Sequence, residues 1–387
     1  MINKRKIAVV VTNRASYARI KTALQAIQKH PRLKLQLIVA ASALLQKFGS
    51  VVDVIVKDGF KVSEQIYSVL EGENVVTMSK TTGLSILELS TAFANLKPDL
   101  VLTVADRYET LATAVAASYM NIPVIHVQGG EITGSIDEKV RHAVTKLAIY
   151  HFTATQKAKQ RVIKMGEFSR NVFMTGCPSI DLALEVIKHQ KKYFPVSIMR
   201  RGVGATFDPK PGRYLMVLQH PVTTQEKEGF KHIQHTLDVI EGLKLPTFWF
   251  WPNVDAGSDL ISKGIRMYRE QGRLAHVHFL RNLPPEEFLS LAIHSACIIG
   301  NSSMAVREAS FLGIPAVNIG NRQTGREFGR NVLHVPHDAR AIQKAVQRQI
   351  KHGPYRRDDL YGRGNAGKKI ANILAAILIT NEKQLSY

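Results

Sequence analysis

LVLTVADRYETLATAVAASYMNIPVIHVQGG, residues 100–130, is the stretch from which the fold of this chain can be predicted. Two apolar runs, Leu100–Val104 and Val124–Val127, flank the amphipathic stretch Glu109–Met120. Short strands without polar alternation are buried on both faces of a sheet, and a helix between two of them is typical of parallel pairing. These residues predict one strand–helix–strand unit of an α/β protein.

The same alternation continues in both directions along the chain. Further strands are expected at Ile7–Val11, Leu35–Ala40, Tyr150–Ala154, Val172–Thr175, Tyr214–Leu218, Thr247–Trp251, Val277–Leu280, Cys297–Ile299, Ala316–Ile319 and Val332–His334. Further helices are expected at Tyr17–Lys29, Ser85–Leu96, Glu138–Leu147, Lys157–Lys164, Lys227–Gly242, Asp259–Gln271, Pro285–His294, Met304–Leu312, Ala339–Lys351 and Lys368–Ile379. The pattern predicts two doubly wound, Rossmann-like parallel sheets, whose ligand sites share a cleft outside the carboxyl ends of the strands.

The length of the chain also favours two domains, because 387 residues exceed what one compact core usually holds. The rhythm of strands and helices breaks between Lys188 and Pro211, a basic stretch with three prolines. We therefore expect an N-terminal domain at residues 1–187, a C-terminal domain at 188–365 and a separate last helix within 366–387.

Composition narrows the classes of function. The net charge of +21 would suit binding to a nucleic acid or to an anionic small substrate. It would also fit a surface that is basic without a specific anionic partner. The positive charges are spread along the chain without regular aromatic neighbours, which argues against nucleic acid. No apolar run is long enough to span a bilayer and the first residues lack a signal-peptide pattern, so we expect no membrane partner. Cys177 and Cys297, far apart in the sequence, predict no disulfide and fit a cytoplasmic location.

Candidate site residues of the first half follow its predicted strands. Arg14 lies in the first strand-to-helix turn, which favours anions but lacks the glycine fingerprint of dinucleotide sites. Alternatively, Arg14 is an exposed residue at the start of a capped helix and binds no ligand. Asp106 and Arg107 follow the strand at Leu100–Val104. Asp106 is a catalytic candidate or a helix cap, and Arg107 a phosphate ligand.

The most specific segment follows the strand at Val124–Val127 and reads QGGEITGSID over residues 128–137. Its glycine pair predicts a close approach of backbone to ligand. Glu131 and Asp137 are expected near Asp106, at the same edge of the sheet. Carboxylates that lie close together raise one another's pKa, so that an acid and a base can coexist at neutral pH.

The second half supplies a predicted diphosphate cradle. His220 lies at a strand end before a proline, a position that favours catalysis or phosphate contact. Ser302 and Ser303 stand in a small-residue turn at a helix start, where amide and hydroxyl groups bind phosphate. Further candidates for nucleotide contacts are Glu308, which could bind a ribose, Arg322 in a polar loop, and Asn253 at the cleft rim. No metal-ligand cluster or redox motif is evident, and we expect no cofactor.

At these residues the chain resembles the hydrolysing UDP-N-acetylglucosamine 2-epimerases, which include the bacterial enzymes of sialic-acid synthesis and the epimerase half of the animal bifunctional epimerase/kinase. The matching pieces run in order over nearly the whole chain. They are Asn13-Arg14-Ala15-x-Tyr17, Asp106-Arg107, Gly129-Gly130-Glu131 through Ile136-Asp137, Arg141-His142-Ala143, Gly176-Cys177-Pro178-Ser179, Gln219-His220-Pro221-Val222-Thr223-Thr224, Gly300-Asn301-Ser302-Ser303, Arg322-Gln323-x-Gly325-Arg326-Glu327, Asn331-Val332-Leu333-His334-Val335 and Tyr361-Gly362-x-Gly364-Asn365-Ala366.

The resemblance implies a GT-B fold with the last helix packed back on the first domain, and a homodimer or homotetramer. It implies removal of the C2 proton of the sugar, loss of UDP to leave a 2-acetamidoglucal, and hydration to free N-acetylmannosamine or the matching 2-epimer. By position, Asp106 and Asp137 match catalytic carboxylates and His220 lies near the diphosphate. The positions of the family's nucleotide contacts are occupied in this chain by Arg14, Arg107, Ser302, Ser303, Glu308 and Arg322.

One position departs from the family pattern. Gln128 stands where the family often has Glu, and an amide cannot act as a base. Glu131, Asp137 or Asp106 would then take the proton, or the substrate would differ, as in relatives acting on UDP- or GDP-diacetylbacillosamine. A non-hydrolysing 2-epimerase and a glycosyltransferase of the same fold remain alternatives.

Overall fold

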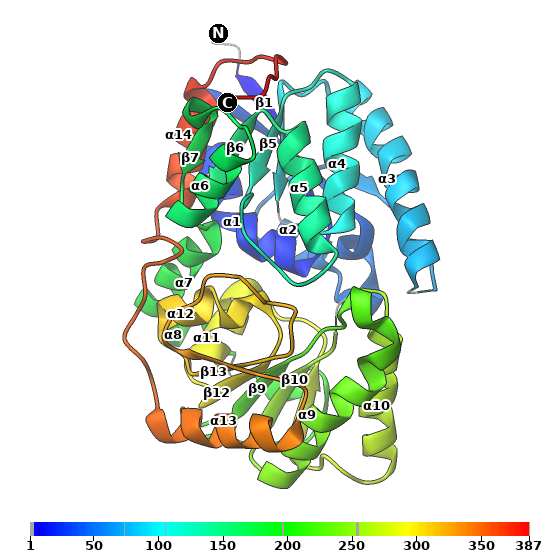
Figure 1. The fold of residues 1–387 in the computed structure, drawn as a ribbon, viewed down its shortest axis with the longest axis vertical. Helices are drawn as coiled ribbons and strands as arrows, with labels where there is room; N and C mark the ends of the chain where they lie inside the picture. Colours follow the sequence, from blue (N-terminus) through cyan, green and yellow to red (C-terminus); the bar gives the residue numbers. More distant parts are fainter. Residues whose placement is uncertain (1–3, 73, 105, 196, 253–254, 387) are drawn as a thin grey trace.

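A computed structural model describes residues 4–72, 74–104, 106–195, 197–252 and 255–386 (Figure 1). Each of two lobes is built on one β-sheet with helices on both faces (Figure 1). Residues of both lobes line a cleft between them. Two parallel-sheet lobes of this kind make the GT-B-like fold, and the predicted fold class is confirmed.

The sheet of the first lobe is entirely parallel, with the order β3-β2-β1-β4-β5-β6-β7. Its strands are β1 (Arg5–Val11), β2 (Leu33–Ala40), β3 (Val62–Ile66), β4 (Leu100–Val104), β5 (Val124–Val127), β6 (Tyr150–Thr153) and β7 (Val172–Met174). Strand β3 was not predicted, because its residues VSEQI lie at the sheet edge and only the last is buried. The other six lie within two residues of their predicted ends.

The helices of the first lobe are α1 (Arg14–Lys29), α2 (Val51–Lys57), α3 (Val75–Leu96), α4 (Tyr108–Tyr119), α5 (Asp137–Leu147), α6 (Gln156–Lys164) and α7 (Pro178–Lys188). Helix α3 begins ten residues before its predicted start, because the Asn74 side chain accepts hydrogen bonds from the amides of Val76 and Thr77. That cap compensates for the poor helix formers of its first turns.

The sheet of the second lobe has the order β14-β13-β12-β9-β10-β11-β8, and only β8 is antiparallel to its neighbour. Its strands are β8 (Val203–Gly204), β9 (Leu215–Leu218), β10 (Thr247–Phe250), β11 (Val277–Leu280), β12 (Cys297–Gly300), β13 (Ala316–Ile319) and β14 (Val332–Val335). Its helices are α8 (Gln190–Tyr193), α9 (Gly229–Leu243), α10 (Ser258–Glu270), α11 (Pro285–Ile293), α12 (Glu308–Leu312) and α13 (Ala339–His352). The predicted connection Lys188–Pro211 therefore contains both α8 and an edge strand.

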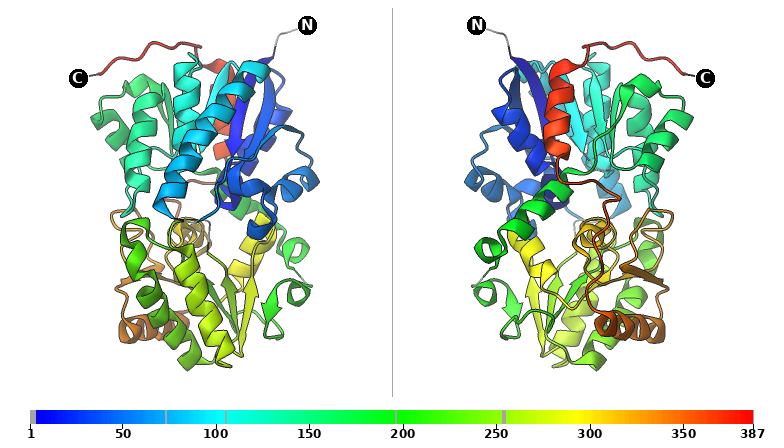
Figure 2. Two further views of the ribbon diagram at one scale, coloured as in Figure 1. Left: turned by 90° about the vertical axis from the view of Figure 1, so that its right-hand side faces the viewer. Right: turned by 90° about the vertical axis from the view of Figure 1, so that its left-hand side faces the viewer.

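The chain crosses between the lobes a second time, after α13. Helix α14 (Ala366–Ala376) then packs on α1, and its Ile370 and Leu374 are fully buried in the core of the first lobe. Figure 2 shows this helix in red beside the blue N-terminal elements. We propose the division 1–187, 188–365 and 366–387 on this path. No helix in the described ranges is long and apolar enough to cross a membrane.

Candidate active site

A cleft between the two sheets has an empty volume of about 1020 Å³ and collects most of the predicted site residues. It lies at the carboxyl ends of strands from both lobes. Its charged and polar lining comprises Asn13, Arg14, Arg19, Asp106, Arg107, Asp137, Ser179, His220, Ser302, Ser303, Glu308 and Arg322. Glu131 and Gln128 do not line this cleft, and Asn253 lies outside the described residues.

Asp106, at the end of β4, is held by three arginines. Its Oδ2 accepts hydrogen bonds from Arg141 at 2.5 Å and from Arg326 of the other lobe at 3.3 Å. Arg19 Nη1 lies 3.7 Å from its Oδ1. Burial favours the protonated acid, but these positive charges outweigh it and hold the pKa of Asp106 well below its ordinary value. Asp106 is therefore ionised at neutral pH.

Asp137, the first residue of α5, has the opposite environment. Its Oδ2 accepts a hydrogen bond from Ser135 Oγ at 3.0 Å, and Arg322 Nη2 is 4.0 Å away. Burial, and next the negative charge of Asp106, raise the pKa of Asp137 despite the nearby arginine. Two carboxyl groups whose pKa values are pushed apart can supply one base and one acid.

Glu131 lies below the cleft, in the contact between the lobes. Its Oε2 accepts hydrogen bonds from Arg307 and, at 3.2 Å, lies beside Arg326, and both arginines belong to the second lobe. Only 4% of Glu131 is exposed. Burial opposes ionisation, but the arginines lower the pKa of Glu131. Glu131 does not line the cleft in this structure and forms ion pairs with Arg307 and Arg326, so its predicted catalytic role stays a prediction.

Gln128 also points away from the cleft. Its backbone has a φ of +70°, and its Nε2 donates to Cys177 Sγ at 2.9 Å. The expected approach of a ligand to the glycine pair stays a prediction, and the structure shows a packing reason for Gly130. A Cβ at Gly130, whose φ is +77°, would meet the carbonyl oxygen of Ala158 at 2.2 Å. Glycine is required there because α6 packs against the loop, and Gly130 is not among the cleft-lining residues.

The second lobe presents a turn between β12 and the 3₁₀ turn Ser303–Ala305. Ser302 caps this turn, and Ser303 Oγ accepts a hydrogen bond from Arg19 Nη2 at 2.6 Å. A diphosphate is bound by hydroxyl groups, by the backbone amides at the start of a helical turn and by guanidinium groups. Glu308, at the start of α12, lines the same part of the cleft.

His220 follows β9 and is positioned through its backbone. Asn301 accepts from the His220 amide and donates to its carbonyl oxygen, both at 2.8 Å. Burial, and then the charges of Arg322 and Arg14, hold the pKa of His220 well below its ordinary value. The imidazole is therefore neutral at neutral pH.

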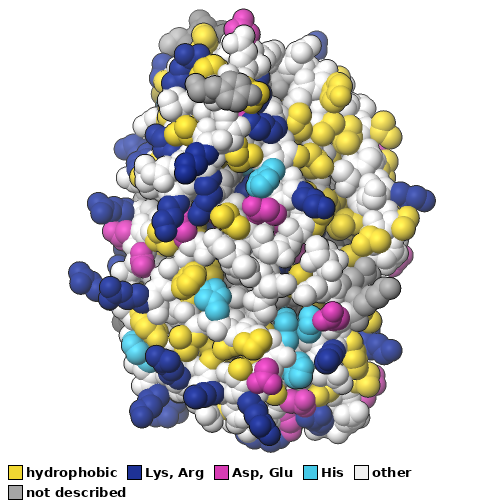
Figure 3. Space-filling model, viewed as in Figure 1, with side chains coloured by type: hydrophobic (Ala, Val, Ile, Leu, Met, Phe, Trp, Pro, Cys, Tyr) yellow, Lys and Arg dark blue, Asp and Glu magenta, His cyan; other side chains and the backbone are white. Residues whose placement is uncertain are grey.

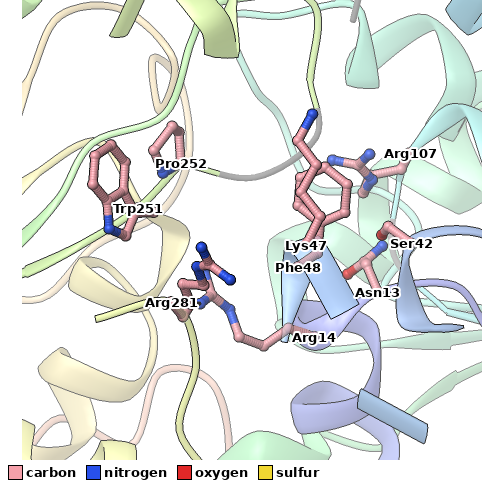
Figure 4. A pocket seen from close by; sticks show the side chains of 9 residues that line it. All are labelled: Asn13, Arg14, Ser42, Lys47, Phe48, Arg107, Trp251, Pro252 and Arg281. Carbon is pink, nitrogen blue, oxygen red and sulfur yellow. Dashed lines mark hydrogen bonds between the residues drawn. The ribbon is translucent and has the colours of Figure 1, made fainter. Parts of the chain in front are cut away.

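Arg107 bridges the lobes. Its Nε and Nη2 donate to the two oxygens of Glu109, each at 3.1 Å, and its Nη1 donates to Asp255 of the second lobe. Arg14 also crosses, since its Nη1 donates to the carbonyl oxygen of Arg281 at 2.5 Å. Both arginines line a smaller pocket beside the main cleft, together with Lys47 and Arg281 (Figure 4). This edge of the cleft carries strong positive charge.

Part of the cleft lining is apolar. Leu182 of α7, Leu283 in the connection from β11 to α11, and Pro285, Phe288 and Leu289 of α11 form it. A flat, uncharged group such as a nucleoside base fits such a surface. In the described ranges, no group of three or more His, Cys, Asp or Glu could hold a metal ion.

Arg19, which contacts both Ser303 and Asp106, was not among the predicted site residues. The spacing of residues on the first helix could have identified Arg19. Arg14, Ala15, Ala18 and Arg19 have the i, i+1, i+4, i+5 spacing of one helix face, and all four line the cleft. Arg141 and Arg326 were named only as parts of motifs. Their contact with Asp106 joins residues 35 and 220 positions apart, which no local pattern indicates.

Comparisons with known proteins agree with this geometry. The family model described as UDP-N-acetylglucosamine 2-epimerase matches residues 25–375. The chain is 32% identical over 374 residues to a UDP-N,N'-diacetylbacillosamine 2-epimerase (hydrolyzing) of Legionella pneumophila, with 96% of each protein covered. It is 31% identical to a GDP/UDP-N,N'-diacetylbacillosamine 2-epimerase (hydrolyzing) of Campylobacter jejuni, over 86% of this chain and 84% of the relative. The fold is similar to that of a Neisseria meningitidis UDP-GlcNAc 2-epimerase solved with UDP-GlcNAc, with a TM-score of 0.76, 20% identity and coverage of 95% and 99%.

Proposed function

The chain belongs to the UDP-N-acetylglucosamine 2-epimerase family, and from this premise we propose that it is a hydrolysing 2-epimerase of UDP-linked 2-acetamido sugars. It would release UDP and the free 2-epimer, which for UDP-N-acetylglucosamine is N-acetylmannosamine. The observation that carries the proposal is the pair of carboxyl groups, Asp106 and Asp137, with opposed pKa shifts in one cleft with the Ser302–Ser303 turn.

In the first step, ionised Asp106 accepts the proton of sugar C2 while the bond from C1 to the diphosphate oxygen breaks. The electron pair of the broken C–H bond forms the C1=C2 double bond of the glucal, and UDP leaves with its charge. The Ser302 and Ser303 hydroxyls, Arg19 and Arg322 would neutralise that charge. An anion at Ser303 also competes with Asp106 for Arg19, which would raise the pKa of Asp106 and make it a stronger base.

In the second step, water adds to C1 of the glucal and a proton adds to C2 on the opposite face. Asp137, whose pKa is raised, is the proton donor of this proposal. The water proton restores Asp137, and the proton that Asp106 took from C2 leaves with UDP or into solvent, so that one water is consumed per UDP released and both carboxyl groups return to their starting states. Neutral His220 lies beside Arg322, the arginine next to Asp137, and would form a hydrogen bond with the diphosphate.

The remaining parts of the substrate would occupy the rest of the cleft. Glu308 would accept hydrogen bonds from the ribose, and the base would lie against the apolar lining at Phe288 and Leu283. For the sugar, we place N,N'-diacetylbacillosamine ahead of N-acetylglucosamine, because two relatives above 30% identity carry the name of an epimerase acting on it.

The test is turnover in D₂O of a panel containing both UDP-sugars and GDP-N,N'-diacetylbacillosamine, followed by NMR. The expected products are UDP or GDP and a free 2-epimer that carries deuterium at C2. A product that stays attached to UDP would indicate a non-hydrolysing epimerase, and transfer to an acceptor without deuterium would indicate a glycosyltransferase. Absence of a free, deuterated 2-epimer from every sugar of the panel would refute the proposal, with the Asp137→Asn protein as the blank.

A further inference from the structure

An open groove on the second lobe has a lining unlike that of the cleft. It lies between the segment after β9, the loop 320–328 and the end of β14, and its empty volume is about 1020 Å³. That is close to the upper end of the roughly 300–1,000 Å³ of small-molecule sites. Figure 3 shows this face of the second lobe, where histidines lie among largely uncharged side chains while lysines and arginines gather at the left and lower edges. No step proposed for the cleft uses this groove.

The groove is lined by uncharged groups. None of its described lining residues is Asp, Glu, Lys or Arg, although 21% of the whole chain is charged. An ionic ligand would therefore find no partner of opposite charge in this lining. A purely apolar ligand would cover polar side chains without pairing them, which costs free energy. The lining therefore favours a ligand that is polar and neutral.

The exposed side chains of the groove are an aromatic ring and several hydrogen-bonding groups. Phe328 is 49% exposed, and its ring centroid lies 4.3 Å from that of His334. Asn318 Nδ2 donates to His334 Nδ1 at 3.1 Å, which leaves the ring proton on Nε2 as a donor. Burial lowers the pKa of His334, so its ring is neutral at neutral pH. Asn321 and Thr324 add an exposed amide and an exposed hydroxyl.

We propose that this groove is a second binding site of the chain and that its ligand is a neutral sugar. A sugar ring has a C–H face, which would lie on the ring of Phe328. The hydroxyl groups at the edge of the sugar would pair with Asn321 and Thr324, and one of them would accept from His334 Nε2. The site goes beyond the reaction proposed for the cleft and does not depend on it.

The loop that forms one wall of the groove also forms a wall of the cleft. Asn321 and Thr324 line the groove, whereas Arg322 between them lines the cleft. Arg322 Nη1 and Gln323 Nε2 both donate to the carbonyl oxygen of Asn301, at 3.2 and 2.8 Å. A sugar that holds this loop thus restrains Arg322. We expect it to tighten the binding of UDP in the cleft about fivefold, the lower end of typical coupling between two sites.

Saturation-transfer NMR on the full chain tests the site without requiring turnover. The probes are N-acetylmannosamine, N-acetylglucosamine and glucose, with glucuronate as the charged control and uracil as a flat base. We expect signals from the ring C–H protons of the neutral sugars and a weaker signal from glucuronate. Phe328→Ala should abolish the sugar signals, whereas Phe328→Tyr, which keeps a ring there, should retain them. His334→Phe keeps a ring and removes the N–H donor, so it should weaken binding severalfold.

Sugar signals that survive Phe328→Ala would place the sugar elsewhere, the cleft included, and would overturn the groove site. Absence of any neutral-sugar signal from the unmodified protein would overturn it as well. A uracil signal that Phe328→Ala removes would assign the groove to a flat base instead of a sugar. Circular dichroism shows whether Phe328→Ala is folded, and His334→Phe carries the same test if it is not.

Calorimetric titration of UDP with and without saturating N-acetylmannosamine tests the coupling between the groove and the cleft. A fivefold gain in UDP affinity that is lost in Phe328→Ala would support it. An unchanged affinity in the unmodified protein, or an equal gain in Phe328→Ala, would overturn it.

Discussion

Arg107 pairs with two carboxylates, one in its own lobe and one in the other lobe. Substituting each in turn separates the contact between the lobes from the stability of the first lobe. Glu109 lies in the same lobe as Arg107, whereas Asp255 reaches it from the other lobe. We predict that Asp255→Asn, which removes the charge and keeps the shape, weakens the contact between the lobes and leaves each lobe folded.

The size of this effect follows from the partners that remain. A hydrogen bond to a charged group contributes about 1.5–3 kcal/mol. Arg107 keeps both bonds to Glu109, so the substitution leaves no buried charge unpaired and the loss should be at the lower end, about 1.5 kcal/mol. A loss of about 1.4 kcal/mol shifts an equilibrium about tenfold. If UDP binds the closed cleft, its affinity should fall by about the same factor.

Calorimetric titration with UDP measures this affinity, and small-angle X-ray scattering of the unliganded protein measures the opening. Glu109→Gln is the matched control, because it weakens two bonds to the same guanidinium within one lobe. That variant should lower the melting temperature more than the affinity for UDP. Unchanged UDP affinity and scattering in Asp255→Asn would contradict this prediction, as would a Glu109→Gln variant that binds UDP equally weakly.

Three further predictions concern the carboxylates. Asp106→Asn and Asp137→Asn should each lower kcat by about 10²–10⁴-fold in the NMR assay while UDP still binds by calorimetry, and near-normal rates in both would remove the acid/base assignment. Glu131→Gln should cost about 3–5 kcal/mol of unfolding free energy in urea, because it leaves the buried Arg307 without its charged partner, and a loss below about 1 kcal/mol would contradict this role. Burial opposes ionisation of Glu167, but hydrogen bonds from His151 and Lys383 lower its pKa to about 2. The folded protein therefore binds fewer protons there than the unfolded chain, and the stabilisation, full above about pH 4.3, should be lost as the pH falls towards the folded value. Urea unfolding of the parent and Glu167→Gln should then converge in acid, and a constant difference between them would refute the assignment.

The rule that ligand sites follow the carboxyl ends of strands predicts much of the cleft lining from the sequence. Asp106, Asp137 and Ser303 follow different strands, and the topology brings them to one cleft. The rule fixes where a backbone segment lies but not where its side chains point. Glu131 and Gln128 belong to the same loop as Asp137, yet they turn inward because Arg307 and Cys177 offer them buried partners.

The edges of the fold were harder to predict for a related reason. Strand β3 is half-polar at the end of its sheet, and β8 has two residues within a proline-rich connection. Both are held by pairing with a neighbouring strand, so their own residues carry little of the signal. The arginines around Asp106 show the same limit, since their pairing depends on how distant segments pack.

The position of α14 has a consequence for biosynthesis. Its Ile370 and Leu374 complete the hydrophobic core that covers α1, but they leave the ribosome only after the whole second lobe has been made. The first lobe to be translated is therefore the last to be finished, and until then the part of α1 that α14 covers stays exposed. During that interval the nascent chain is a natural client for chaperones, and a ribosome that stalls after α13 would leave behind a polypeptide prone to aggregate.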